Sequence, residues 1–298
     1  MSVDRLMTEQ SNAFSVELDQ LGIEEAAVLM NREDAFVAPC VGRALPAIAA
    51  AVRAASAALA GGGRLVYIGA GNSGRIGYLD ALECQPTFGT SPDQVIGIVA
   101  GGFGGVTESV EDFPARGRAD LEALALRRGD IVVGLTASGR TPYVLGALAY
   151  ARGLGCRTVS VACNTGSEVS AVAEIAIEVD CGPEILAGST RLKAGTAQKM
   201  ICNMLSTLTM VSLGKTYGNL MLDVQVRNQK LRLRAQSIVM QATGISSEAA
   251  ARALEEASLR PRIAILMLLT ELDAASAEAL SARHGGSIHR ALQAHRLS

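Results

Sequence analysis

Arg64-Leu-Val-Tyr-Ile-Gly-Ala-Gly-Asn-Ser-Gly-Arg75 is the stretch of the chain that decides its fold. Its apolar part, from Leu65 to Ile68, predicts a buried strand, and a helical pattern begins at Ser73 after the glycines. A strand that turns through glycines into a helix leaves backbone N–H groups at the helix start that point the same way, which suits an anion. The stretch therefore predicts a strand–loop–helix unit with an anion-binding loop.

A second copy of this unit lies further along the chain. Val133-Gly-Leu-Thr-Ala-Ser-Gly-Arg140 places Gly134 where the first copy has Gly69, and it repeats Ser-Gly-Arg. Two matched loops indicate a phosphorylated small molecule held at the carboxyl edge of a parallel sheet. Ser and Thr at helix starts are also ordinary N-caps, but capping and phosphate binding use the same geometry and do not exclude each other. The candidate phosphate-binding residues of the two loops are Gly71, Asn72, Ser73, Gly74, Ser138, Gly139 and Thr141.

The first loop also matches the spacing of a dinucleotide-binding fingerprint, through Gly69, Gly71 and Gly74. That fingerprint needs an acidic residue about 20 positions further on, at the end of the second strand. Here the expected second strand, residues 94–100, is followed by Gly101-Gly102. We therefore expect no nicotinamide or flavin cofactor.

Apolar strands alternate with helical segments through the middle of the chain. This alternation predicts an α/β fold in which helices cover both faces of a parallel sheet. The expected strands are 64–69, 94–100, 130–136, 156–162 and 174–179. Three regions follow: an N-terminal helical segment (1–44), the sheet domain (45–220) and a C-terminal helical region (221–298) with a small bundle at 243–298. Within them we expect a helix at 73–83, a long helix at 189–213 and another at about 223–240.

Composition limits the location and the partners of the protein. A net charge of −2 over 298 residues favours neither nucleic acid nor an anionic membrane, and no apolar run is long enough to span a bilayer. Six scattered cysteines without a C-x-x-C pair indicate reduced thiols and a cytoplasmic location. The three histidines all lie in the last fifteen residues with poor metal-ligand spacing, so we expect no metal site.

Two glutamates are candidates for acid–base chemistry, although each could also be a solvated surface carboxylate. Glu83 follows the first loop's helix, and Glu111 lies in the connection after the second strand. If 73–83 is one helix, Glu83 is about 15 Å from Ser73 along it, which exceeds the length of a hexose phosphate. Either the helix ends early, or Glu83 serves the site of a second subunit, and we favour a homodimer with shared sites.

A third anion-binding candidate is the start of the long helix. Ser189 and Lys193 offer a hydroxyl and a cation there, although a capped helix with solvated cations would look the same. Glu184, shortly before it, is either a ligand contact or simply polar.

Several motifs together resemble the N-acetylmuramic acid 6-phosphate etherase family, which has the sugar isomerase (SIS) fold and is related to glucokinase regulatory protein. The resemblance runs from Met7-Thr-Glu-Gln-Ser-Asn12 to the C-terminal bundle. The motifs are the Gly-Ala-Gly-x-Ser-Gly-Arg loop, Leu79-Asp-Ala-x-Glu-Cys84, Ala137-Ser-Gly-Arg-Thr-Pro-Tyr143, Gly188-Ser-x-Arg-Leu-Lys-Ala-Gly-Thr-Ala-Gln-Lys199, Gly218-Asn-Leu-Met221 and His284-Gly-Gly286.

The resemblance implies a three-layer αβα sandwich with five parallel strands, and a lyase of cell-wall sugar recycling. Its reaction would remove D-lactate from N-acetylmuramic acid 6-phosphate by elimination and then add water, leaving N-acetylglucosamine 6-phosphate. The resemblance implies that this reaction uses no metal and no redox cofactor. Glu83 matches the family's proton donor. Glu111-Asp112, before Gly117-Arg-Ala-Asp-Leu121, matches the segment of the base, so the resemblance assigns Glu111 as base.

Two departures and two alternatives accompany the resemblance. The loop after Gly102 is about three residues shorter than is usual, with Phe103 where an acid is common, and Asn72 replaces a Thr. Both changes lie at the edge of the expected site and bear on substrate choice. The alternatives are an aldose–ketose isomerase of the same fold, and a non-catalytic sugar-phosphate sensor similar to glucokinase regulatory protein.

Overall fold

The computed structural model describes residues 6–103, 110–226 and 228–297, so the shortened loop after Gly102 lies largely outside the described residues. The chain forms two compact units. Unit 1 contains the residues up to 82 together with 92–206, and unit 2 contains 83–91 together with the residues from 207 onward. The domain boundaries that the sequence predicts after residues 44 and 220 stay predictions.

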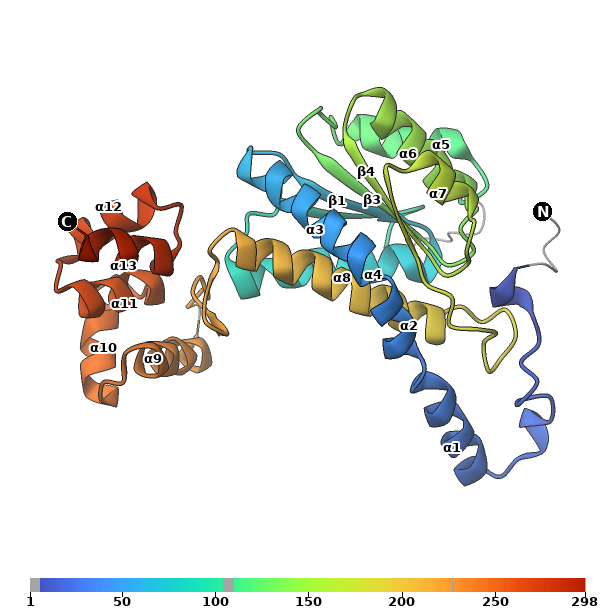
Figure 1. Cartoon of the computed structure of the whole chain (residues 1–298), viewed down its shortest axis with the longest axis horizontal. Helices are drawn as coiled ribbons and strands as arrows, with labels where there is room; N and C mark the ends of the chain where they lie inside the picture. The colour runs from blue at the N-terminus through green and yellow to red at the C-terminus, as the bar shows by residue number, and fades with distance from the viewer. Residues whose placement is uncertain (1–5, 104–109, 227, 298) are drawn as a thin grey trace. The chain divides into compact units, whose positions relative to one another are not determined.

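Unit 1 is built on one parallel sheet, as predicted (Figure 1). The strand order is β2-β1-β3-β4-β5, and Gly69 of the first strand pairs with Leu135 of the third. Because these strands are parallel neighbours, the two predicted loops leave the sheet side by side at its carboxyl edge. The strands are β1 (Leu65–Gly69), β2 (Val95–Val99), β3 (Ile131–Thr136), β4 (Arg157–Ala162) and β5 (Ile175–Glu178).

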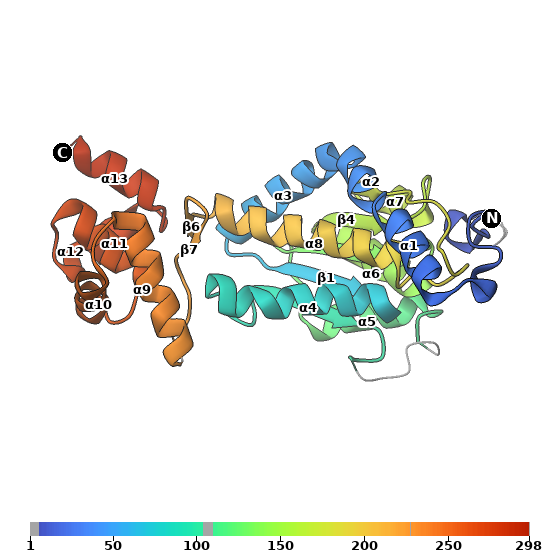
Figure 2. The ribbon, with the colours of Figure 1, turned by 90° about the horizontal axis from the view of Figure 1, so that it is seen from below.

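Helices cover both faces of the sheet, which confirms the three-layer α/β sandwich (Figures 1 and 2). One face carries α3 (Leu45–Ala60), α4 (Gly71–Phe88) and α8 (Lys193–Ser212). The other carries α5 (Pro114–Ala123), α6 (Pro142–Gly153) and α7 (Glu168–Val172). β1 and β3 are buried along their whole length, as their apolar sequences predict.

Glycines bring α5 and α6 into close contact. A Cβ atom at Gly117 would lie 2.0 Å from the carbonyl oxygen of Tyr143, and one at Gly146 would lie 2.1 Å from that of Pro114. No larger residue fits at these two positions without moving a backbone. This contact fixes the segment that begins with Glu111 against the start of α6.

The N-terminal helices include one that is largely uncovered. Unit 1 begins with two short 3₁₀ turns, η2 (Met7–Glu9) and η3 (Leu18–Gln20), followed by α1 (Ile23–Asp34) and α2 (Val37–Arg43). Glu33 is the one buried residue of α1, whereas Ile23 and Val28 are 84% and 70% exposed. Exposed apolar side chains gathered on one helix are typical of surfaces that contact another molecule.

Three helix boundaries differ from the prediction, each for a local reason. Helix α4 does not end at Glu83 but continues to Phe88, with Pro86 in its last turn. Helix α8 starts at Lys193 rather than residue 189, because the Glu184 carboxylate caps it there. Helix α9 (Gln229–Thr243) starts six residues later than expected, because the Asn228 side chain accepts a hydrogen bond from the Leu231 N–H at 2.9 Å.

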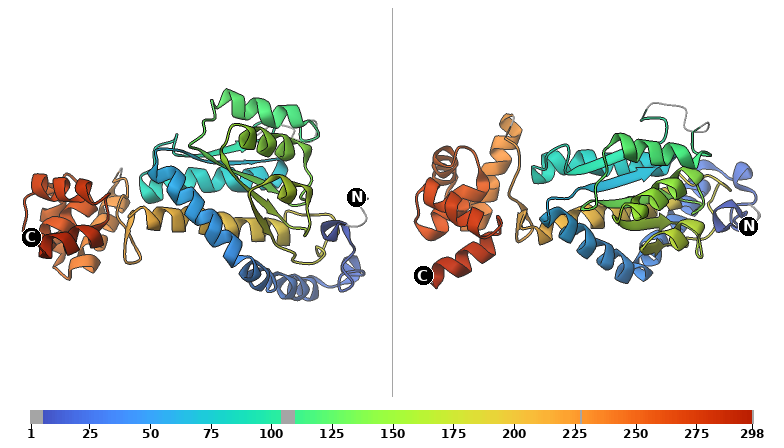
Figure 3. Two further views of the ribbon diagram at one scale, coloured as in Figure 1. Left: turned by 45° about the horizontal axis from the view of Figure 1, so that its top comes forward. Right: turned by 90° about the horizontal axis from the view of Figure 1, so that it is seen from above.

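Unit 2 is mainly helical (Figure 3). Four short helices follow α9, in agreement with the small bundle expected from residue 243, and a two-stranded hairpin precedes it. The hairpin strands are β6 (Thr216–Tyr217) and β7 (Leu220–Met221), and the helices are α10 (Ser247–Glu256), α11 (Pro261–Thr270), α12 (Ala274–Arg283) and α13 (Ile288–Arg296). Side chains of Leu222, Ile238, Leu254, Ile265 and Ile288 form part of its own core.

Within the described ranges, no single helix has the length and apolar character needed to cross a bilayer, although the bent pair 23–43 and 45–60 meets that criterion jointly.

A buried ion pair holds the starts of β1 and β3 together. The Asp130 carboxylate is fully buried and accepts hydrogen bonds from the Arg64 backbone at 2.9 Å, the Arg64 guanidinium at 2.6 Å and the Arg127 backbone at 3.0 Å. Burial raises the pKa of Asp130, but the hydrogen bonds and charge of Arg64 and the Arg127 N–H together leave the pKa below its ordinary value. The pair therefore stabilises unit 1 above the pKa of an unfolded Asp, near pH 4, and the contribution is lost as the pH falls below it.

Replacement of Asp130 by Ala is expected to lower the free energy of unfolding by about 3 kcal/mol, since it leaves the half-buried Arg64 guanidinium and two backbone N–H groups without their carboxylate partner. Urea unfolding at pH 7 measures this loss. Glu122→Ala is the control, because Glu122 pairs with Arg118 on the surface and its removal should cost less than about 0.5 kcal/mol. Equal losses for the two variants would contradict the assigned role of Asp130.

Candidate functional site

The second loop forms a network of hydroxyl groups at the carboxyl end of β3. The Thr136 hydroxyl lies 2.7 Å from the Thr141 hydroxyl and 3.3 Å from that of Ser138. The Gly139 N–H donates to Thr136 Oγ1 at 3.3 Å, and the Arg140 N–H donates to Ser138 Oγ at 3.4 Å. These two bonds are long, so an anion can replace them at little cost. Such a loop can present hydroxyl and N–H donors to a phosphate.

A cavity of about 380 Å³ opens beside this loop, within the usual size range for small-molecule sites. It brings together three predicted residues, Ser138, Thr141 and Glu111, which come from two different connections of the sheet. The complete lining is Leu6, Glu9, Glu111, Asp112, Ser138, Arg140, Thr141, Pro142 and Glu168.

Glu111 is held at the cavity by the start of α6. Its carbonyl oxygen accepts a hydrogen bond from the Tyr143 N–H at 2.9 Å, and the Tyr143 hydroxyl donates to the Asp120 carboxylate of α5. Burial, together with the Asp120 carboxylate, raises the pKa of Tyr143, so the phenol stays protonated and remains a donor. The backbone of Glu111 is thereby fixed while its side chain lines the cavity.

The first loop lies at the same sheet edge but does not line this cavity. Its turn is tight: a Cβ atom at Gly74 would lie 2.4 Å from the Gly69 carbonyl oxygen, so the turn itself requires glycine at that position. Ser73 is buried, and the Asn72 side chain packs on α8, where a Cβ atom at Gly195 would meet Asn72 Nδ2 at 2.8 Å. The first loop is therefore held against α8 by Asn72, the residue that stands where the family usually has Thr.

The start of α8 is capped by a carboxylate from the preceding segment. The N–H groups of Lys193 and Ala194 both donate to the Glu184 carboxylate at 2.9 Å. Burial raises the pKa of Glu184, which is 1% exposed, and the two N–H groups act in the opposite direction. Because Glu184 already occupies these donors, the helix start does not offer them to a ligand.

Lys193 is likewise occupied. Its ammonium group is buried and lies 2.8 Å from the Glu33 carboxylate of α1, which also accepts a hydrogen bond from Asn12 at 2.7 Å. This ion pair joins α1 to α8, and the contact between Lys193 and a ligand stays a prediction. Ser189 precedes the helix and is half-buried.

Glu83 lies on the exposed side of α4, ten residues and about 15 Å along the helix from Ser73. Because α4 is continuous from Gly71 to Phe88, the possibility that the helix ends early and turns back is excluded. Leu79 and Pro86, four residues before and three residues after Glu83, lie on the same helix face and are exposed. The adjacent Leu82 is 45% exposed as well.

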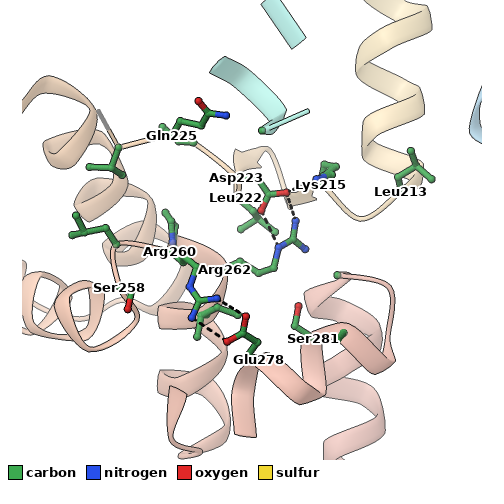
Figure 4. A pocket seen from close by; sticks show the side chains of 18 of the residues that line it. Leu213, Lys215, Leu222, Asp223, Gln225, Ser258, Arg260, Arg262, Glu278 and Ser281 are labelled. Carbon is green, nitrogen blue, oxygen red and sulfur yellow. Dashed lines mark hydrogen bonds and ion pairs between the residues drawn. The ribbon is translucent and has the colours of Figure 1, made fainter. Parts of the chain in front are cut away.

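Unit 2 contains a larger cavity, of about 700 Å³, which holds none of the predicted site residues (Figure 4). Both of its carboxylates are paired with cations: the Asp223 carboxylate lies 2.7 Å from Arg262 and 2.9 Å from Lys215, and Arg260 pairs with Glu278. We therefore assign the candidate active site to the smaller cavity of unit 1.

Arg262 also explains the glycines of the His284-Gly-Gly286 motif. Its Nη1 donates to the Gly214 carbonyl at 2.8 Å, and a Cβ atom at Gly286 would lie 2.9 Å from that nitrogen. Gly286 also has a φ of +77°, which favours glycine. This motif supports the fold of unit 2.

In the part of the chain that the structure describes, no three His, Cys, Asp or Glu side chains are arranged to hold a metal ion. All six cysteines are buried and unpaired by disulfides.

The N-terminal contribution to the cavity is not visible in the pattern of strands and loops. Leu6 and Glu9 line it, although the segment was expected only to be helical and polar. The available signal was the Met7-Thr-Glu-Gln-Ser-Asn12 motif, whose residues form no amphipathic pattern and therefore suggested no contact.

Comparison with known proteins identifies close relatives over the whole chain. The family description "Glucokinase regulatory protein N-terminal SIS domain" matches residues 47–152, and "SIS domain" matches residues 106–208. The chain is 68% identical over 292 residues to an N-acetylmuramic acid 6-phosphate etherase of Burkholderia lata, covering 98% of this chain and 97% of that one. It is 52% identical to the protein of the same name from Streptomyces coelicolor, with 98% and 95% covered. A solved phosphoheptose isomerase from Neisseria gonorrhoeae gives a TM-score of 0.49 at 15% identity, with 63% and 98% covered.

Proposed function

The chain belongs to the N-acetylmuramic acid 6-phosphate etherase family, and from this premise we propose how its residues carry out the reaction. The protein is a carbon–oxygen lyase that converts N-acetylmuramic acid 6-phosphate and water to N-acetylglucosamine 6-phosphate and D-lactate. The observation that carries this function is the high identity to named etherases along the full length of the chain.

The reaction proceeds by elimination and then addition. In the open-chain sugar the aldehyde at C1 acidifies the C2 proton. A carboxylate base removes that proton, the C3–O bond breaks, and the lactyl oxygen leaves with a proton from a carboxylic acid. Water then adds its hydroxyl to C3 and its proton to C2, so the overall reaction needs no oxidant or reductant.

We assign Glu111 as the base. The assignment is supported by the cavity, where Glu111 lies with Ser138 and Thr141. A phosphate held by the hydroxyls of the second loop, with Gly139 at the turn, would leave the sugar carbons within the same cavity as the carboxylate. The neighbouring first loop, Gly71, Asn72, Ser73 and Gly74, would complete the anion site, since both loops leave the sheet at one edge.

We assign Glu83 as the proton donor, acting in the site of a second subunit. Two observations support a homodimer with shared sites. Exposed Leu79, Leu82 and Pro86 lie near Glu83 on α4, which suggests that another protein surface covers it. In addition, α1 exposes Ile23 and Val28, and a symmetric partner would bury such residues. The protein would act in the cytoplasm, where its free thiols stay reduced.

The test is the fate of solvent atoms during turnover. With purified protein and N-acetylmuramic acid 6-phosphate in D₂O, we expect one D-lactate per sugar and one deuterium at C2. In ¹⁸O-labelled water the label should enter the 3-hydroxyl of the sugar and not the lactate. Isomerised sugar without lactate would indicate an aldose–ketose isomerase, and binding without turnover would indicate a sensor.

A further inference from the structure

Residues 6–12, here called the N-terminal strap, are fastened to unit 1 by buried polar side chains. The Asn164 side chain accepts a hydrogen bond from the Met7 N–H at 2.8 Å and donates one to Thr8 Oγ1 at 3.1 Å. At the other end, Asn12 donates to Glu33 at 2.7 Å and to the Pro183 carbonyl at 3.2 Å. Thr8, Asn12 and Asn164 are each at most 5% exposed, so these bonds are shielded from water.

The same Asn164 side chain holds the second loop. Its amide nitrogen lies 3.1 Å from the carbonyl oxygen of Ala137 and 3.4 Å from that of Ser138. Asn164 follows β4, so one buried amide at the carboxyl edge of the sheet joins the strap to the loop that we propose binds phosphate. A shift of the strap therefore alters one wall of the cavity relative to Ser138.

Glu9 is the charged residue of the strap that lines the cavity. It follows the buried Thr8, is itself exposed and lines the cavity with Ser138 and Glu111. It also lies against the Gly188 turn, where a Cβ atom would be 3.3 Å from Glu9 Oε2. An ionised carboxylate only accepts hydrogen bonds and repels a phosphate, so its suitable partners on a phosphorylated amino sugar are hydroxyl and amide N–H groups.

We propose that the N-terminal strap is a wall of the substrate site, in which Glu9 recognises hydroxyl or amide N–H donors of the sugar and Asn164 is a positioning residue. This inference rests on the proposed function for the identity of the ligand, but not on turnover. A purely structural strap would support the fold without distinguishing a sugar phosphate from a bare phosphate.

Binding measurements on the full chain separate these two roles. The ligands are N-acetylglucosamine 6-phosphate and inorganic phosphate, titrated by calorimetry. Glu9→Ala should weaken the sugar phosphate about tenfold, the value of one hydrogen bond to a charged group, and leave inorganic phosphate unchanged or tighter because a nearby negative charge is removed. Ser138→Ala should weaken both ligands, and Gln10→Ala, at the exposed neighbouring position, should change neither.

Thr8→Val tests the positioning role without disturbing the second loop. It removes the Oγ1 acceptor of Asn164 but leaves the bonds of Asn164 to Ala137 and Ser138. Sugar-phosphate affinity should fall several-fold and KM should rise with kcat nearly unchanged, while affinity for inorganic phosphate is retained.

The proposal is overturned if Glu9→Ala leaves sugar-phosphate affinity within twofold of the wild type, or weakens both ligands equally. These outcomes are independent of catalysis. If the wild type releases no D-lactate, the etherase function is refuted. If Glu9→Ala in the same protein selectively lowers the affinity for the sugar phosphate, the role of the strap is still supported. Release of D-lactate by the wild type, together with unchanged sugar-phosphate affinity in Glu9→Ala, would support the etherase function and refute the role of the strap.

Discussion

Replacement of Glu111 by Gln is expected to lower kcat for D-lactate release about a thousandfold. The amide keeps the size of the side chain and its place in the cavity but cannot accept the C2 proton. KM should change much less, because in the proposed site the second loop, and not this carboxylate, binds the phosphate. A coupled assay for D-lactate measures kcat. Exchange of the C2 proton in D₂O reports the proton-abstraction step alone, and this exchange should also be lost in Glu111→Gln.

Asp112→Asn is the matched control for this variant. Asp112 is the next residue, lines the same cavity and is exposed, so its replacement removes an equal charge from the same segment. Its kcat should stay within a few-fold of the wild type. Were Asp112→Asn to abolish C2 exchange and Glu111→Gln to retain it, the roles of the two carboxylates would have to be interchanged.

Glu83→Gln is expected to lower kcat by two to three orders of magnitude, since the leaving oxygen loses its proton source. A larger change in activity, a gain, is expected when subunits of two inactive variants are mixed. In a dimer that joins a Glu83→Gln chain to a Glu111→Gln chain, one of the two shared sites contains both wild-type glutamates. Two inactive proteins should therefore combine to give about half the wild-type activity per dimer.

Coexpression of the two variants with different affinity tags, followed by purification on both tags, provides such mixed dimers. The control is a dimer in which one chain carries both substitutions and the other is wild type. It retains no site with both glutamates if the sites are shared, because each site then loses one. Activity confined to this control, with none in the mixed dimer, would mean that each chain works with its own pair.

The sheet and its second loop were predictable because they depend on local patterns. Apolar strands such as Leu65 to Ile68 can be buried only within a sheet covered on both faces, and the repeat of Ser-Gly-Arg fixes where the loops leave it. Parallel pairing of β1 with β3 then brings the loops to the same edge. The placement of Glu111 beside Ser138 follows from this geometry together with the close α5–α6 contact.

Other features depend on contacts between residues far apart in the sequence. Nothing in the pattern around Lys193 reveals that Glu184 takes the N–H groups of the helix start, or that Glu33 neutralises the lysine. The strap is similar, because Asn164 binds Met7 across 157 residues.

The continuation of α4 through Pro86 is unexpected for another reason. Proline normally predicts a helix end, but in the last turn of a helix it removes only one hydrogen bond.

The exposed helix α1 has a consequence for how the protein responds to dilution. A helix of 12 residues with a single buried side chain gains little from its own packing, and isolated helices of that length are marginal in water. Its persistence would then depend on mass action, through the surface that covers Ile23 and Val28. Because the Glu33 carboxylate at its end accepts hydrogen bonds from Lys193 and Asn12, fraying of α1 would also remove one of the contacts that hold the strap.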